Sequence, residues 1–339
     1  MTEIKGVESQ NYPSFICRLY LEKSSETRYN MVNKYLTKEK EEMFIDIHAH
    51  AYRIQPPGGG MQTIEAILKN YDELKIDMGC ILPCVNPEVY FVQSVDDVIE
   101  MADKYPDRVI PYCNVDPRVG SNTSTTNIAK ILQKYKDKGC KGIGEVMPAM
   151  EVLDPKVQNL FAAAEEVDMP IVYDGSVSKG NGFGLYDDPG LPQLEYTLWQ
   201  FPNAKIFGHG PVFWSEIGKL DTVAERGVYW NYRGRQVERL PKGPIYEEGT
   251  VPKLLRKCPN LHGDLSDGTA YNAIARDDKY GPRFLSEFED RLYYGTDFCT
   301  PKLPVRLDQL LISWKETGKI SETTFRKIAY DNAAKLFDL

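Results

Sequence analysis

Phe44-Ile45-Asp46-Ile47-His48-Ala49-His50 is the stretch of the chain from which both the fold and the candidate site are inferred. Its apolar residues predict a β-strand that runs into two histidines separated by one residue. Because residues i and i+2 of a strand point to the same face, the two imidazoles are expected to project in the same direction. Imidazole nitrogen is a common ligand of transition metals. The chain has four histidines, and two of them stand here, so we expect half of a metal site.

Apolar, strand-like runs alternate with helix-like segments from this stretch to the end of the chain. Mostly apolar strands that alternate with helices are typical of parallel strands covered by helices. Eight such units, followed by a last helix over 322–337, predict an α/β protein with a closed (β/α)8 TIM barrel. The predicted strands are Phe44–His48, Met78–Pro83, Val109–Val115, Lys141–Val146, Pro170–Asp174, Lys205–His209, Leu261–Leu265 and Leu292–Asp297.

Two segments fall outside this regular pattern. Residues 1–42 are polar and end in a mixed-charge run, so they predict an N-terminal extension before a barrel domain over 43–339. A long insertion follows the sixth strand, between His209 and Leu261. Loops of this length in a domain are usually functional or carry structure of their own, and we expect this one to lie over the mouth of the barrel.

Composition excludes several classes of protein. The 339 residues carry a formal net charge of -8 without a basic run, which argues against nucleic-acid binding. No apolar run approaches the roughly 18 residues that a membrane helix needs, and no signal peptide is evident. The seven cysteines are scattered without a Cys-x-x-Cys pair, as expected of free thiols in a reducing cytoplasm.

Most of the predicted strands end in a residue that can ligate a metal or transfer a proton. In parallel barrels the active site lies at the carboxyl ends of the strands. The candidates after strands four, five, six and eight are Glu145, Asp174, His209 and Asp297. Each has a simpler interpretation: Glu145 as the partner of a basic residue, Asp174 as a turn residue, and Asp297 as a helix N-cap. His262, in strand seven, is interpreted as structural.

The ordered set of His48-x-His50, His209 and Gly295-Thr296-Asp297 resembles the amidohydrolase superfamily. The likeness is greatest to its carboxymuconate-semialdehyde decarboxylase-like branch, and it runs from about Phe44 to the C-terminus. Most of it lies in 208–217, Gly-His-Gly-Pro-Val-Phe-Trp-Ser-Glu-Ile, and in 295–299, Gly-Thr-Asp-Phe-Cys. The resemblance implies a mononuclear or binuclear divalent-metal site in a barrel. It implies that the first-strand histidines and Asp297 contact the metal or its water, and that His209 contacts metal or assists proton transfer.

The chain departs from this family after strand five, where a histidine ligand is usual and Asp174 stands instead. Aspartate is a harder, anionic ligand, so the preferred metal or its affinity could differ. Glu145 could compensate from strand four, where the superfamily often places a ligand. The expected metal set is therefore His48, His50, Glu145, Asp174 and Asp297, holding zinc first, with manganese or another divalent ion as the alternative.

Three functions are compatible with this pattern. The first is metal-dependent hydrolysis of an amide, lactone or similar bond in a small molecule, with Asp297 and His209 as catalytic residues. The second is metal-dependent, non-oxidative decarboxylation of an unsaturated or aromatic acid. The third is a catalytically inactive ligand-binding barrel. Arg118, Arg233 and Trp214 could bind an anionic substrate, although such arginines more often form salt bridges. Relatives often form dimers, so a homodimer is also expected.

Overall fold

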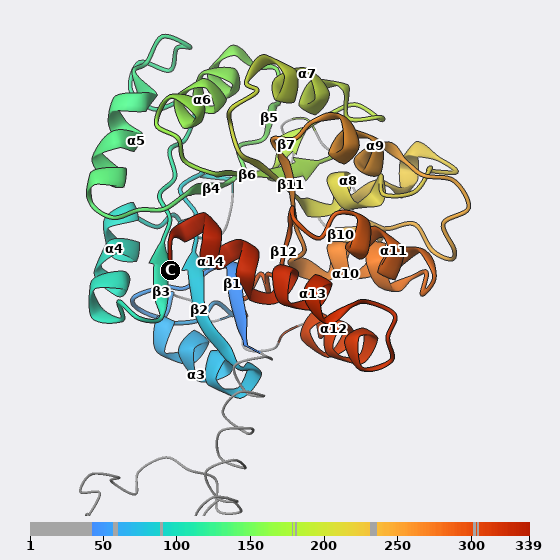
Figure 1. Cartoon of the computed structure of the whole chain (residues 1–339). Coiled ribbons are helices and arrows are strands. Elements are labelled where there is room, and N and C mark those ends of the chain that lie inside the picture. Colours follow the sequence, from blue (N-terminus) through green and yellow to red (C-terminus); the bar gives the residue numbers. More distant parts are fainter. Residues whose placement is uncertain are drawn as a thin grey trace, which may run out of the picture. The chain divides into compact units, whose positions relative to one another are not determined.

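Eight parallel strands form the centre of the fold in the part of the chain that the structure describes (Figure 1). The structure is a computed structural model and describes residues 43–339 apart from 57–59, 89–90, 178, 180–181, 231–235, 301–302 and 304. The predicted extension over 1–42 lies outside the described residues. The eight strands are β1 (Phe44–Ala49), β2 (Ile76–Ile81), β3 (Val109–Pro111), β4 (Ile143–Val146), β6 (Ile171–Ser176), β8 (Ile206–His209), β11 (Leu261–Asp264) and β12 (Leu292–Tyr293).

These strands pair in chain order. β1, β2 and β3 form one parallel group, and β4, β6, β8, β11 and β12 form another. Isolated parallel bridges join the two groups at both edges, Cys113 to Ile143 and Ala49 to Phe298. At the second seam, the Asp297 amide also donates to the His48 carbonyl at 2.8 Å. The predicted (β/α)8 fold is thus confirmed, and its first and last strands meet where the candidate residues stand.

Helices cover the outside of the ring and turn their apolar faces toward it. In α3, the buried residues Ile64, Ile67, Leu68 and Tyr71 follow the i, i+3, i+4, i+7 spacing of one helix face. The helices are α3 (Ile64–Leu74), α4 (Val95–Lys104), α5 (Ile128–Asp137), α6 (Pro155–Glu166), α7 (Pro192–Gln200), α8 (Gly210–Ser215), α9 (Thr250–Lys257), α10 (Asp267–Ala275), α11 (Tyr280–Glu287), α12 (Leu307–Glu316), α13 (Glu322–Arg326) and α14 (Asn332–Phe337). None of the described helices is long and apolar enough to cross a bilayer.

The last helix was predicted over 322–337 as one piece. The structure keeps this segment helical but divides it by a π-helical turn, Lys327–Asp331, between α13 and α14. Figure 1 shows α14 crossing in front of the strands near the C-terminus. Phe337 of α14 packs against Tyr112 and belongs to the same cluster as the inward residues Ile47, Leu82 and Phe207. This cluster fills the interior of the barrel, so the candidate site lies above a packed floor.

The insertion after the sixth strand has its own structure. It contains α8, a short 3₁₀ turn (Val223–Glu225), an antiparallel hairpin of β9 (Gly227–Trp230) and β10 (Gln236–Arg239), and then α9. A buried ion pair, Arg226 Nε to Glu216 Oε1 at 2.9 Å, anchors the hairpin to α8. Gly227 lies against Pro211, just after β8, so the hairpin begins at the rim of the barrel as expected. Its tip, 231–235, lies outside the described residues. Short strands β5 (Met150–Glu151) and β7 (Leu185–Tyr186) extend the same rim.

Candidate metal centre and active site

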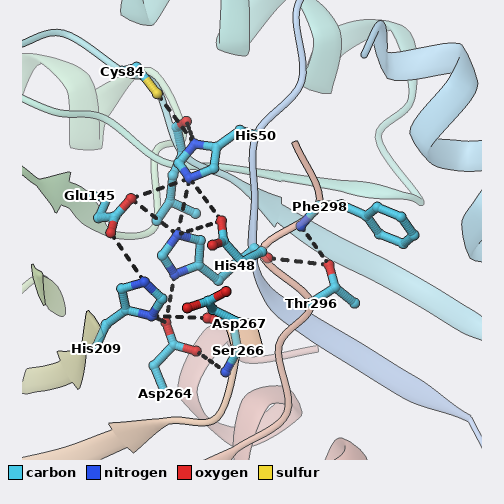
Figure 2. Close-up of polar contacts among 12 residues, drawn as sticks. His48, His50, Cys84, Glu145, His209, Asp264, Ser266, Asp267, Thr296 and Phe298 are labelled. Atoms are coloured by element: carbon cyan, nitrogen blue, oxygen red, sulfur yellow. Dashed lines mark hydrogen bonds and ion pairs between the residues drawn. The ribbon is translucent and has the colours of Figure 1, made fainter. Parts of the chain in front are cut away.

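The two histidines of the first strand lie side by side at the carboxyl end of the ring (Figure 2). His48 is fully buried and His50 is 3% exposed. Ala49, between them, faces the other way and bridges to β2 and to Phe298. The period of two in the strand therefore brings both imidazoles to one point, and their Nε2 atoms are 3.1 Å apart.

The hydrogen bonds of the other ring nitrogens define which atoms face the site. His50 Nδ1 lies 2.9 Å from the carbonyl oxygen of Leu82, and His48 Nδ1 lies 2.6 Å from Asp264 Oδ2. A carbonyl and a carboxylate only accept, so both Nδ1 atoms must carry hydrogen. In the neutral imidazoles the two Nε2 atoms then present lone pairs to each other, an arrangement that requires a cation between them.

Glu145 and Asp297 complete a set of four donor atoms. Glu145 Oε2 lies 3.3 Å from His50 Nε2 and 3.5 Å from His48 Nε2. Asp297 Oδ1 lies 3.4 Å and 3.8 Å from the same two nitrogens. A tetrahedral ion with bonds of about 2.1 Å separates its ligands by roughly 3.4 Å. The separations between these donors match that value, so two imidazoles and two carboxylates fit a divalent ion such as zinc or manganese.

The charges of these groups lead to the same conclusion. Burial would lower the pKa of His48, but the adjacent carboxylates of Asp264 and Glu145 raise it well above its usual range. Burial would likewise raise the pKa of Glu145, whereas His209 and His48 hold it well below its usual range. The buried carboxylates stay ionised and demand positive charge beside them. A divalent ion supplies this charge where protons otherwise would.

His209, at the end of β8, faces two carboxylates. Its Nε2 lies 3.3 Å from Glu145 Oε1 and its Nδ1 lies 3.3 Å from Asp264 Oδ2. Burial and the neighbouring His48 would lower the pKa of His209, but Glu145 and Asp264 raise it to about 9. At neutral pH the ring is therefore an imidazolium, which can donate a proton or stabilise a developing negative charge.

Asp297 is the most open of the four donors, with 24% of its side chain exposed. Its φ of 54° lies in the left-handed region, which a residue with a Cβ rarely adopts. The hydrogen bond from its amide to His48 holds this conformation. Such strained residues cluster at functional sites, and here the strain turns the carboxylate toward both first-strand imidazoles at the open side of the site.

A network that the sequence did not reveal fixes β1 against the loop after β12. The buried carboxylate of Asp46 accepts from the amides of His48 and Thr296 and from the hydroxyl of Tyr71. Burial raises the pKa of Asp46 to about 6, although these donors act in the opposite direction. Asp46 thus holds the strand that carries the histidines next to the segment that carries Asp297.

Three further side chains at the site were also missed as functional candidates. Asp264 contacts both His48 and His209, Ser266 Oγ lies 3.1 Å from His209 Nδ1, and Cys84 Sγ lies 3.5 Å from His50 Nδ1. Figure 2 shows all three around the imidazoles. Asp264 ends a strand, as the predicted site residues do, and that position was the signal available in the sequence.

Asp174 is not among the converging donor atoms of the described residues, so the structure does not bring it into the metal set as predicted. It is buried, and its carboxylate lies between two glycines of positive φ, Gly184 and Gly210, where a Cβ would collide with it. Desolvation raises the pKa of Asp174 well above its usual range, and the carboxylate of Glu145 adds to the effect. It lies near the site as a carboxyl group set apart from the four donors.

The predicted substrate-binding residues need correction. Trp214 is only 1% exposed, and its indole donates to the backbone oxygen of Asp264, so it packs beneath the site and cannot contact a substrate. The guanidinium of Arg118 is occupied by Glu88 at 2.7 Å and by Asp116 at 2.6 Å. These carboxylates neutralise the charge that was to bind an anion. Arg233 lies outside the described residues.

Comparison with known proteins agrees with this architecture. Residues 246–339 match the amidohydrolase family model, and no curated protein matches the chain. An uncharacterised TIM-barrel protein from Bordetella bronchiseptica shares 16% identity and a TM-score of 0.58, over 87% of this chain and 98% of its own. An amidohydrolase from Burkholderia multivorans with bound zinc shares 13% identity and a TM-score of 0.53, over 88% and 99%.

A 5-carboxyvanillate decarboxylase from Novosphingobium aromaticivorans is also similar in structure. It contains manganese and 3-methoxy-4-hydroxy-5-nitrobenzoic acid, and it shares 17% identity and a TM-score of 0.50, over 80% of each chain. At these identities the neighbours establish the fold. Together with the match of the C-terminal part, they confirm the resemblance to the amidohydrolase superfamily that the motifs predicted.

Proposed function

Starting from an amidohydrolase-type barrel, we propose that this chain is a metal-dependent hydrolase of an amide, lactone or similar bond in a small molecule. The observation that carries the proposal is the convergence of His48, His50, Glu145 and Asp297 at tetrahedral spacing. A divalent ion held by them would acidify a water molecule and polarise a carbonyl group.

The residues around these donors supply the remaining parts of a hydrolysis. Asp297, at the open side, accepts the proton of the attacking water as its oxygen bonds to the carbonyl carbon. The imidazolium of His209 donates a hydrogen bond to the carbonyl oxygen as negative charge develops there. When the bond to the leaving nitrogen or oxygen breaks, Asp297 returns the proton to that atom, so the proton count balances.

Decarboxylation is the second candidate. The imidazolium of His209 could deliver a proton to carbon, and one structural neighbour is a decarboxylase that contains manganese. This reaction requires recognition of a carboxylate substrate, and the arginine predicted for that task, Arg118, is already paired. Hydrolysis requires no such cation, which is why we rank it first.

The test compares both reactions in one preparation. The protein is stripped with a chelator, reloaded with zinc or manganese, and assayed against a panel of amides and lactones and a panel of hydroxybenzoates and muconates. We expect metal-dependent hydrolysis. Carbon dioxide release without hydrolysis would support the second candidate, and metal binding without either reaction would support a ligand-binding barrel. Full hydrolysis by the stripped protein would contradict the role of the metal.

A further inference from the structure

We infer that Asp264 is a positioning residue that holds two catalytic imidazoles on one carboxylate oxygen. Its Oδ2 meets Nδ1 of His48, which the proposed function makes a metal ligand, and Nδ1 of His209, which it makes the hydrogen-bond donor to the substrate. The inference rests on that proposed function. It adds that a single side chain determines both which nitrogen of His48 faces the metal and how His209 is oriented.

The geometry is specific to this carboxylate. Asp264 is fully buried, with Oδ2 2.6 Å from His48 Nδ1 and 3.3 Å from His209 Nδ1. The two rings lie with their centroids 4.4 Å apart and their planes tilted by 38°. Figure 2 shows Asp264 beneath both of them. One oxygen therefore reaches two rings that come from β1 and β8, strands that are not neighbours in the barrel.

Asp264 is itself held at three points. Its Oδ1 accepts from the amide of Ser266 at 2.9 Å, and its backbone oxygen accepts from the indole of Trp214 at 2.9 Å. Its strand, β11, pairs with β8 and β12. With no freedom to rotate, the carboxylate imposes its position on the imidazoles, as outer partners of metal-binding histidines commonly do.

The negative charge of Asp264 is needed because only an acceptor forces hydrogen onto Nδ1 of His48. An asparagine of the same shape could turn its NH2 group toward Nδ1, and hydrogen would then move to Nε2, the atom that faces the metal. The wrong tautomer would remain folded but would not bind the ion. Ser266 reaches only His209, so the two residues separate the two roles.

The experiment compares Asp264→Asn with Ser266→Ala as the matched variant. Zinc affinity is measured by competition with a chromophoric chelator, and the coordination of cobalt is followed by visible absorption. For Asp264→Asn we expect a roughly 10–100-fold loss of zinc affinity, an altered cobalt spectrum and a lowered kcat. For Ser266→Ala we expect wild-type affinity and spectrum with a lowered kcat. Wild-type affinity and spectrum in Asp264→Asn would overturn the inference.

A measurement on the unaltered chain keeps the inference testable if Asp264→Asn does not fold. The chain has four histidines, so selective ¹⁵N-histidine labelling gives four imidazoles to assign. In the zinc-loaded protein we expect hydrogen on Nδ1 of His48 and metal on Nε2. Metal on Nδ1, or hydrogen on Nε2, would overturn the role of Asp264. Failure of the wild-type chain to bind zinc would instead contradict the proposed function itself.

Discussion

The four histidines of this chain occupy two contrasting regions of one barrel. At the rim, His48 and His209 each have both ring nitrogens against carboxylates or other polar groups, and their pKa values are raised. One layer below Asp264, His262 stacks on Phe207 at 4.9 Å, and its Nδ1 has no partner among the described residues. Burial, with Arg291 and Lys205 adding to it, lowers the pKa of His262 to about 4.

The difference shows that burial alone does not make a functional histidine. Both environments exclude water, but only the rim supplies carboxylates that compensate a positive charge. The rim is therefore built to hold a cation, and the barrel floor is built to exclude one. Each prediction below alters one side of this contrast.

Removing a rim imidazole should have the largest effect. In His50→Ala, the donor set loses one nitrogen and leaves two buried carboxylates with less compensation. We expect loss of bound metal and a fall in activity beyond the roughly 10–100-fold typical of losing an outer partner. Elemental analysis and the hydrolysis assay measure both. The control is His262→Phe, which should keep its metal; equal metal loss in both variants would contradict the contrast.

Neutralising the open carboxylate should have the next largest effect. Asp297→Asn keeps the size of the side chain but removes the proton acceptor. We expect kcat to fall about 10²–10⁴-fold, the range typical of general acid–base groups, with a smaller change in KM. Steady-state kinetics in saturating zinc separate the two parameters. A variant with wild-type kcat would show that Asp297 does not accept the proton.

The floor histidine should make the protein sensitive to acid. Its pKa is lower in the folded chain, about 4, than the ordinary 6.5, so its stabilising contribution is complete above pH 6.5 and is lost as the pH falls toward 4. At about 1.4 kcal/mol per pH unit, the full loss is about 3 kcal/mol.

His262→Phe preserves stacking on Phe207 and Tyr293 and removes the titration. We therefore expect the variant to lose less stability than wild type between pH 6.5 and 4, as measured by urea unfolding. Parallel stability curves for the two proteins across this range would contradict the assignment.

Removing an already neutralised charge should have the smallest effect. Arg118→Ala breaks a partly exposed pair with Glu88 and Asp116, so we expect at most about 1 kcal/mol of lost stability and an unchanged KM. Thermal unfolding and substrate titration test this. A KM that rises strongly would restore Arg118 as a substrate-binding residue.

The sequence predicted the strands and the rim well because those features are local. Buried apolar runs mark the strands, and the period of two places His48 and His50 on one face. What it could not predict depends on orientation across the ring. Asp264 meets His48 only because strands far apart in the sequence face the same interior. Trp214 was misplaced because α8 begins directly after His209 and turns the indole into the packed layer.

Asp174 shows the same limit in a single residue. Its position two residues after Val172, on the inward face of β6, suggested a metal ligand. The glycines of two later loops, Gly184 and Gly210, then provide the space that its carboxylate occupies. Loops of this kind leave no periodic signal, so the direction of a strand-end side chain was beyond the sequence pattern.

The most direct test of the account is anomalous diffraction from crystals of the chain loaded with zinc. We predict one strong peak about 2.1 Å from Nε2 of both His48 and His50, with Glu145 and Asp297 as its carboxylate ligands. A fully loaded protein with no peak between those two nitrogens, or with its zinc bound elsewhere, would contradict the metal centre on which the proposed function depends.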